Sequence, residues 1–105
     1  MTDFIQVMTT VAGREEAEKM ARHLLAARLA ACVQLVGPVT SFFWWQGRID
    51  SAGEYLCIIK SSSQLYKKIE AAIKEIHPYE VPEILAVPVV AGGPEYLRWL
   101  ATELA

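Results

Sequence analysis

The residues best suited to chemistry lie in one short segment, H-P-Y-E-V-P at positions 77–82. It carries an imidazole (His77), a phenol (Tyr79) and a carboxylate (Glu80) within four positions. The prolines at 78 and 82 fix the backbone φ angle, which lowers the entropy cost of holding these groups around a ligand. The segment therefore predicts a site for a ligand. The alternative is a rigid connector in which His77 and Tyr79 cap a helix and pack.

The remaining candidate groups are two cysteines and one lysine. Cys32 and Cys57 are too few for a disulfide framework and lack the C-x-x-C spacing of a metal centre. Both are expected to behave as small, partly or fully buried hydrophobic residues that stay reduced in the cytoplasm. Lys60 follows an apolar run, and we expect it to pair with Glu54 or to meet an anion.

Composition excludes several classes of function. Ten basic and twelve acidic residues give a net charge of −2, which argues against a nucleic-acid or anionic-membrane partner. No run approaches the length of a membrane-spanning helix, and the start of the chain resembles no secretory signal, so a cytoplasmic protein is expected. A Gly-rich phosphate loop and a G-x-S-x-G motif are both absent. The sequence thus gives no indication of an enzyme.

The length of 105 residues allows one domain, residues 1–105. Its hydrophobic fraction of 53% is high for a small chain, which suggests that some apolar surface is buried against another copy. The run S-F-F-W-W at 41–45 supports this interpretation. Phe42 and Trp44 alternate with Phe43 and Trp45 along an expected strand, so aromatic side chains occupy both faces and both faces need cover. Phe42, Phe43 and Trp44 are therefore predicted interface residues.

The elements that would position these residues follow from periodicity. Strands are expected at 4–8, at 31–46 with an edge or bulge at Gly37-Pro38, at 54–60 and at 83–90. A helix is expected from Arg14, with a core stripe formed by Ala17, Met20, Ala21, Leu24 and Leu25. A second helix should open at the S-x-x-Q pattern of 61–64 as a capping box and end before His77-Pro78. Gln46-Gly47 should turn a hairpin, and Gly93-Pro94 should start a last helix.

This order of elements predicts an α+β fold. Two right-handed crossovers that share one antiparallel sheet give a ferredoxin-like split βαβ sandwich, β-α-β-β-α-β plus a C-terminal helix, with the two crossover helices on one face.

Five motifs occur together in one order: L-A-A-C at 29–32, S-x-x-x-W at 41–45, the Glu54-to-Lys60 spacing, H-P-Y-E-V-P-E at 77–83 and Y-L-x-W at 96–99. In this combination the chain resembles the CutA divalent-cation-tolerance family over most of its length. The resemblance implies a ferredoxin-like homotrimer, similar in build to PII signalling proteins, with a link to tolerance of divalent cations, copper above all. It implies no catalytic reaction and no organic cofactor.

The resemblance also implies roles for single positions. Cys32 and His77 match the positions most often suspected of holding metal, with Glu80 beside His77. Further motif positions would line clefts between subunits or the interface: Trp45, Lys60, Tyr79, Glu83, Tyr96 and Trp99. The chain departs from the family at Phe43, where tyrosine is common, and at Ser61, where threonine is common; the missing phenol removes one polar group from the cleft.

Three functions follow as expectations. The first is a non-enzymatic trimer that binds a divalent metal ion, most plausibly Cu²⁺. The second is a PII-like signalling module with a small anionic or nucleotide-like ligand in the cleft between subunits. The third is a trimeric scaffold that docks a protein partner.

Overall fold

The computed structural model describes residues 3–105, which form four strands, three α-helices and one short 3₁₀ turn. In chain order they are β1 (Phe4–Val11), α1 (Arg14–Ala26), β2 (Cys32–Trp45), β3 (Arg48–Ser62), η1 (Ser63–Leu65), α2 (Tyr66–Ile76), β4 (Leu85–Pro88) and α3 (Pro94–Glu103).

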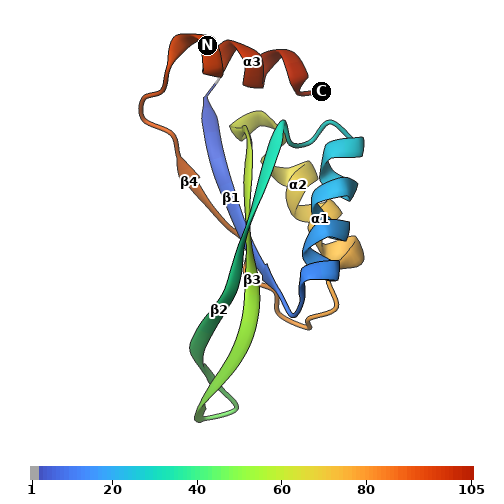
Figure 1. The fold of residues 1–105 in the computed structure, drawn as a ribbon, viewed down its shortest axis with the longest axis vertical. Helices are drawn as coiled ribbons and strands as arrows, with labels where there is room; N and C mark the ends of the chain where they lie inside the picture. The colour runs from blue at the N-terminus through green and yellow to red at the C-terminus, as the bar shows by residue number, and fades with distance from the viewer. Residues whose placement is uncertain (1–2) are drawn as a thin grey trace.

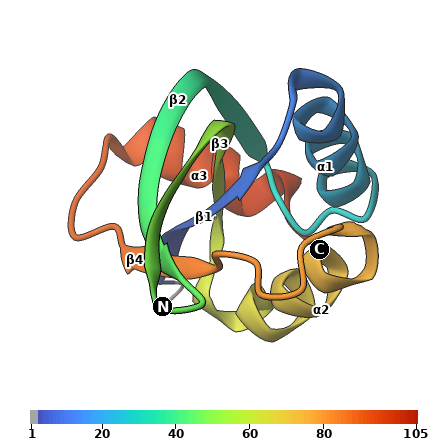
Figure 2. The same ribbon diagram turned by 90° about the horizontal axis from the view of Figure 1, so that it is seen from below.

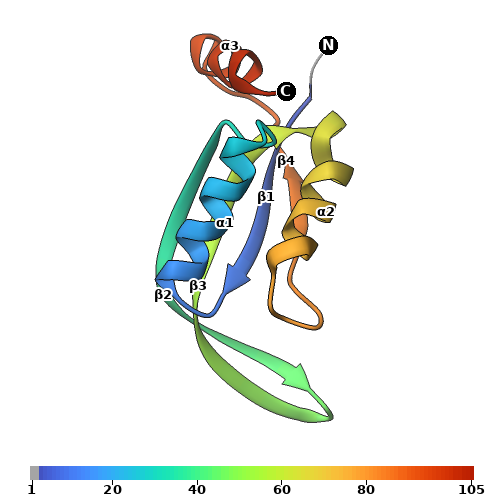
Figure 3. The same cartoon turned by 90° about the vertical axis from the view of Figure 1, so that its right-hand side faces the viewer.

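The strands form one antiparallel sheet in the order β2-β3-β1-β4. Helices α1 and α2 lie side by side over one face of the sheet, and α3 crosses one end (Figures 1 and 3). Seen along the long axis, α3 runs behind β2 and β3, and α1 and α2 lie to one side of the strands (Figure 2). This architecture confirms the predicted α+β, ferredoxin-like arrangement with a C-terminal helix.

The core lies between the sheet and the two crossover helices. Alternate residues of the central strands face the helices, among them Val7 and Ile59, which are register partners and fully buried. Ala17, Met20 and Leu24 of α1 meet them, as the helical spacing predicts. Two members of the predicted stripe differ: Ala21 is half-buried and Leu25 is 39% exposed. Leu25 follows Leu24 by one residue, a rotation of about 100° that carries it off the sheet-facing side.

The kink in β2 is a bulge on an edge strand, as predicted. Val36 pairs with Leu56 and Val39 with Glu54, so Gly37 and Pro38 both lie opposite Tyr55. Edge position and bulge explain how the strand accepts a proline that donates no ladder hydrogen bond. Gly37 is required here because a Cβ atom would lie 2.5 Å from the Tyr55 ring.

Beyond the bulge, β2 and β3 continue as a two-stranded ribbon, residues 39–54, which we call the arm. The arm projects past the rest of the molecule and accounts for its elongated shape of 44 × 26 × 23 Å (Figure 1). Gln46 and Gly47 turn its tip with φ angles of 50° and 77°, the positive values of a two-residue hairpin turn whose twist matches the strands. Phe42 and Trp44 on the arm are 74% and 72% exposed.

The capping box predicted at 61–64 is wrong. Ser61 is a fully buried residue of β3, and its hydroxyl donates a 2.6 Å hydrogen bond to the carbonyl oxygen of Leu29. Helix α2 begins at Tyr66, after the 3₁₀ turn, and has no side-chain cap. Pairing of Ser61 with Ile5 extends β3 through the motif, so long-range sheet pairing overrides the local capping preference.

The other boundaries differ by a few residues. Strand β3 is longer than the predicted 54–60, because the hairpin pairs from the turn onward, and β4 is shorter than the predicted 83–90. Helix α2 ends before His77-Pro78 and α3 begins at Pro94, both as predicted. The end of α3 is tied to the loop after α1 by a 2.7 Å ion pair between Arg28 and Glu103.

Candidate functional site

The larger of two hollows formed by the described residues is a groove of about 870 Å³ between the arm and the loop that follows His77; we call it the arm–loop groove. One wall is the arm and the other is the loop of residues 79–83. Its lining residues are Thr10, Ser41, Phe42, Phe43, Trp44, Trp45, Asp50, Ala52, Glu54, Tyr79, Glu80, Val81, Pro82 and Glu83.

Strand register explains how the arm builds its wall. Phe43 pairs with Asp50, Trp45 with Arg48, and Val39 with Glu54. Residues directly opposite in an antiparallel pair share a face, and so do residues two apart along a strand. Phe43, Trp45, Arg48, Asp50 and Glu54 therefore lie on one face of the arm, with the Phe43 ring opposite the Asp50 carboxylate and the Trp45 ring opposite Arg48.

Glu54 and Tyr79 join the two walls. The Tyr79 hydroxyl donates a 2.9 Å hydrogen bond to Oε2 of Glu54, and Glu54 is only 6% exposed. Burial, this hydrogen bond and the charges of Glu54 and Glu16 raise the pKa of Tyr79 to about 12. At neutral pH the phenol therefore stays protonated and acts as a donor to Glu54.

The groove carries a concentration of negative charge. Its lining contains four carboxylates, Asp50, Glu54, Glu80 and Glu83, and the described residues that line it include no lysine, arginine or histidine. Burial and the neighbouring charge of Glu54 raise the pKa of Glu83. A raised carboxyl pKa is what an acid without a nearby counter-charge shows. The groove therefore favours a cation over an anion.

His77 lies behind the loop and holds it in place. Its Nε2 lies 2.8 Å from the carbonyl oxygen of Thr10, and its Nδ1 accepts a 3.2 Å hydrogen bond from the Tyr79 backbone N–H. Because Nδ1 accepts, the proton of the neutral ring is on Nε2, which donates to Thr10. Both nitrogens are thus engaged and the residue is 8% exposed. This is the arrangement expected of the rigid connector.

Cys32 lies elsewhere. It pairs with Lys60, whereas Thr10, the partner of His77, pairs with Leu56. Four residues along β3 separate these places by about 13 Å. Among residues 3–105, no three His, Cys, Asp or Glu side chains come together as metal ligands. The predicted ligands His77, Cys32 and Glu80 are therefore not brought together within residues 3–105, because Cys32 lies about four residues of strand away from the place where His77 meets Thr10.

The predicted cleft residues fall into two groups. Trp45, Tyr79 and Glu83 line the arm–loop groove, while Lys60, Tyr96 and Trp99 meet near α3. The Lys60 Nζ lies 3.4 Å from the Tyr96 hydroxyl and 5.5 Å from the centre of its ring, and the Tyr96 and Trp99 rings are 5.5 Å apart. The expected pairing of Lys60 with Glu54 is wrong. Six residues of strand separate Lys60 from Glu54 by about 20 Å. The hydrogen-bond partner of Glu54 is the Tyr79 hydroxyl instead.

Asp50 is the groove residue that sequence reasoning missed, and Glu54 was considered only as a partner for Lys60. The alternation of Asp50, Ala52 and Glu54 along one strand, opposite Phe43 and Ser41 across a two-residue turn, is the pattern that identifies both.

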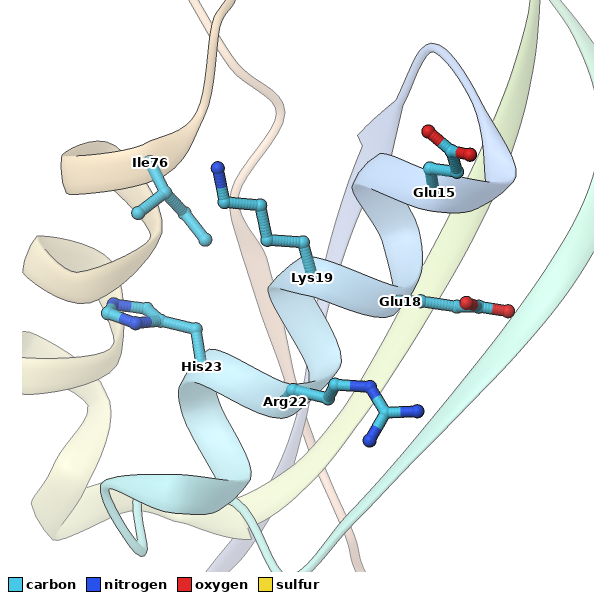
Figure 4. Close-up of a pocket in the computed structure, with 6 residues that line it drawn as sticks. All are labelled: Glu15, Glu18, Lys19, Arg22, His23 and Ile76. Atoms are coloured by element: carbon cyan, nitrogen blue, oxygen red, sulfur yellow. The ribbon is translucent and has the colours of Figure 1, made fainter.

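A second hollow of about 550 Å³ lies between α1 and α2. Figure 4 shows Lys19 and His23 extended toward Ile76 of α2, whereas Glu18 and Arg22 extend the other way. The polar groups diverge and none is a predicted site residue, so this hollow is an ordinary part of the helical surface. None of the helices in the described part of the chain is long and apolar enough to cross a membrane.

Comparison with known proteins agrees with the fold and the motifs. Residues 5–103 match the family described as CutA1 divalent ion tolerance protein. The chain is 42% identical to the divalent-cation tolerance protein CutA of Thermus thermophilus, over 90% of this chain and 91% of that protein. The corresponding protein of Archaeoglobus fulgidus is 40% identical, over 95% of each chain. The crystal structure of CutA1 from Oryza sativa superposes with a TM-score of 0.96 at 34% identity, covering 98% of this chain and 94% of that one. The chain therefore belongs to the CutA1 divalent ion tolerance family.

Proposed function

We propose that the protein acts in tolerance of divalent cations as a non-enzymatic homotrimer that binds a divalent metal ion, copper above all. The observation that carries this proposal is the charge of the arm–loop groove, whose lining combines four carboxylates with no basic side chain among the described residues. The relatives named above are called divalent-cation tolerance proteins, and an acidic groove suits that role.

Carboxylate oxygens are the donors that the groove itself supplies. Glu80 and Glu83 are exposed at its rim, so they reach an incoming ion without a large rearrangement. An ion held by one or two carboxylates keeps several waters or takes further ligands from a second subunit. His77 can bind the ion only if its Nδ1 gives up the hydrogen bond from the Tyr79 backbone N–H. Cys32 can contribute only if it comes from a neighbouring subunit.

Titration calorimetry of Cu²⁺ into metal-free protein tests the proposal. We expect Glu80→Gln and Glu83→Gln to weaken binding, and Glu75→Gln, an exposed substitution on α2, to leave it unchanged. Comparison of His77→Gln and Cys32→Ser with the parent then tests the two predicted ligands separately. Equal affinity and stoichiometry in all these variants would place copper outside the proposed site.

A trimer is supported by the arm. Phe42 and Trp44 expose large aromatic surfaces on a two-stranded ribbon that has little support from the rest of the chain (Figure 1). Such ribbons are marginal in water, and obligate interfaces are more apolar than ordinary surface. We infer that the arm packs on neighbouring subunits. A scaffold that docks another protein is the alternative use of the same surface.

A second candidate function has its own observation. Lys60, Tyr96 and Trp99 form a basic and aromatic cluster about 20 Å from Glu54, and Lys60 makes no ion pair among residues 3–105. If the protein is a PII-like module with an anionic ligand, this cluster suits the ligand better than the acidic groove does. Thermal-shift screening of nucleotides on the parent and Lys60→Gln tests it, since only a ligand held by Lys60 loses its stabilising effect.

We propose a cytoplasmic location. Cys32 and Cys57 are both free, which suits a reducing compartment. Some relatives are named for another compartment, among them the chloroplastic CutA 1 of Oryza sativa. Subcellular fractionation followed by detection of the protein in each fraction tests the proposal.

A further inference from the structure

Arg28 has a backbone conformation that its residue type does not favour. Helix α1 ends in a Schellman motif. In this motif the N–H of Arg28 donates to the carbonyl oxygen of Leu25, and the N–H of Leu29 donates to that of Leu24. Arg28 thereby has a φ of 58°, in the left-handed region that glycine adopts at no steric cost. A larger residue persists in this conformation only when contacts with its surroundings hold it there.

Those contacts join Arg28 to the end of α3. Its guanidinium makes the 2.7 Å ion pair with Glu103 and donates a 3.2 Å hydrogen bond to the backbone carbonyl oxygen of the same residue. The carbonyl oxygen of Arg28 accepts a 2.9 Å hydrogen bond from the N–H of Ala105. Leu104, between these two partners, is half-buried against the core. A cation is also favourable beside the carbonyl groups at the C-terminus of a helix. Side chain and backbone of Arg28 therefore both hold the end of α3.

The rest of α3 is attached more loosely. Leu100 is its only buried residue, and it lies outside the main core cluster. Before the helix, the N–H of Val89 donates a 2.9 Å hydrogen bond to the carbonyl oxygen of Phe4. None of the hydrogen bonds described for the chain ties residues 90–92 to another segment, and Val90 is 93% exposed. Helix α3 thus crosses the end of the sheet on a free linker at one side and on Arg28 at the other (Figure 3).

Helix α3 also engages a charged group of the sheet. Val7 and Ile59 face α1 and α2, so Lys60, the next residue of β3, faces the uncovered side of the sheet. The Nζ of Lys60 lies 3.4 Å from the Tyr96 hydroxyl and 5.5 Å from the centre of the Tyr96 ring. These are the contacts described for this ammonium group, which makes no ion pair among residues 3–105. In its docked position, α3 therefore occupies Lys60.

We infer that α3 is a hinged cover that opens as a unit while the core stays folded, and that Arg28 is the clasp that holds it closed over Lys60. Opening breaks one exposed ion pair and uncovers Leu100, but it leaves the core between the sheet and the helices α1 and α2 intact. An anion can then compete with Tyr96 for the Lys60 ammonium. The clasp does not depend on metal binding; its use for an anionic ligand rests on the second candidate function proposed above.

Hydrogen exchange of the full-length protein, measured by mass spectrometry of peptides, tests the clasp. We expect residues 94–105 to exchange faster than β1 and β3 in the parent. Arg28→Gln should speed exchange of 94–105 about three- to fivefold, as the loss of one exposed ion pair implies, without changing β1 and β3. Arg14→Gln is the matched control, because it removes the ion pair with Glu18 on α1, and it should leave 94–105 unchanged. Sedimentation of each variant at the same concentration verifies that its assembly matches the parent.

Arg28→Gly separates the clasp from the backbone strain. Glycine relieves the positive φ but removes the guanidinium, so we expect 94–105 to exchange faster although the end of α1 is less strained. Slower exchange of 94–105 in Arg28→Gly would overturn the inference. Two other results would do the same: equal protection of 94–105 and β1 in the parent, or an equal change in both segments in Arg28→Gln.

Acetylation of lysines by N-hydroxysuccinimidyl acetate tests whether α3 covers Lys60. We expect Lys60 to react about three- to fivefold faster in Arg28→Gln than in the parent, in step with hydrogen exchange. Lys68, exposed on α2, is the internal reference and should react at the same rate in both proteins. An unchanged rate at Lys60 together with faster exchange of 94–105 would show that α3 opens without covering Lys60. Neither measurement uses a ligand, so a negative nucleotide screen overturns the second candidate function and leaves the clasp standing.

Discussion

The imidazole Nε2 of His77 donates a 2.8 Å hydrogen bond to the carbonyl oxygen of Thr10. Thr10 lies beyond the last residue of β1 that pairs with β4, which is Met8 opposite Leu85. The His77 side chain therefore supplies a hydrogen bond to β1 beyond the point where its pairing with β4 ends. In the same ring, Nδ1 accepts from the Tyr79 backbone, so one buried residue connects the central strand to the loop wall of the groove.

Replacing His77 should consequently reduce stability. We expect His77→Ala to lower the free energy of unfolding by about 1–3 kcal/mol, because the Thr10 carbonyl and the Tyr79 N–H lose their partner in a buried place. Urea unfolding at fixed protein concentration measures this. His23→Ala on the surface of α1 is the control and should change little. An unchanged urea midpoint for His77→Ala would contradict the positioning role.

The hydrogen bond between Tyr79 and Glu54 should make stability depend on alkaline pH. The folded-state pKa of Tyr79 is raised to about 12 from an ordinary value of 10.0, so its contribution is fully present below pH 10 and is lost as the pH rises toward 12. We expect the parent to lose more stability than Tyr79→Phe between pH 9 and pH 11.5 (about one unit below and about one and a half units above the ordinary tyrosine pKa). Parallel loss in both proteins would show that the phenol does not carry the effect.

The two thiols should differ in reactivity. Cys57 is fully buried in the core and its pKa is raised to about 11 by burial, so little thiolate forms at neutral pH, whereas Cys32 is half-buried. We expect a thiol reagent to modify Cys32 first and Cys57 only after unfolding. In Cys32→Ser the native reaction should disappear and reappear in denaturant. Rapid native labelling of Cys32→Ser would contradict the assignment.

Removing aromatic surface from the arm should weaken assembly. We expect Phe42→Ser and Trp44→Ser to shift sedimentation toward the monomer at concentrations where the parent is assembled. Each substitution removes a large aromatic side chain that is exposed in the single chain and would be buried in the proposed trimer. Val90→Ser removes an even more exposed apolar side chain away from the arm and should sediment like the parent. If all three variants sediment like the parent, the arm is not the surface that holds the proposed trimer together.

Protons should compete with a cation in the groove. The pKa of Glu83 is raised by burial and by Glu54, so this carboxylate is neutralised at a higher pH than an ordinary glutamate. Binding of Cu²⁺ in the proposed site should therefore weaken as the pH falls, and Glu83→Gln should flatten that dependence while lowering the affinity at neutral pH. Affinity that is constant down to mildly acidic pH would exclude a role for Glu83.

Local patterns were sufficient for the order of the elements and for several details. The positions of Ala17, Met20 and Leu24 repeat at helical spacing, the pair Gln46-Gly47 adopts positive φ, and Pro38 falls on an edge strand at a bulge. Each depends on neighbours in the chain or on a backbone restriction of one residue type. The motifs from L-A-A-C to Y-L-x-W likewise identified the family.

Long-range pairing decided the rest. Ser61 reads as a helix cap in sequence, yet sheet pairing buries it and directs its hydroxyl to Leu29. Glu54 and Lys60 share a face of β3, but an extended strand separates them by about 20 Å and gives Glu54 to Tyr79 and Lys60 to Tyr96. Sequence thus determined which groups are present and in which elements they lie. Only the register of β2 on β3 and the path of the loop after His77 decided which groups meet, because both depend on contacts between residues far apart in the chain.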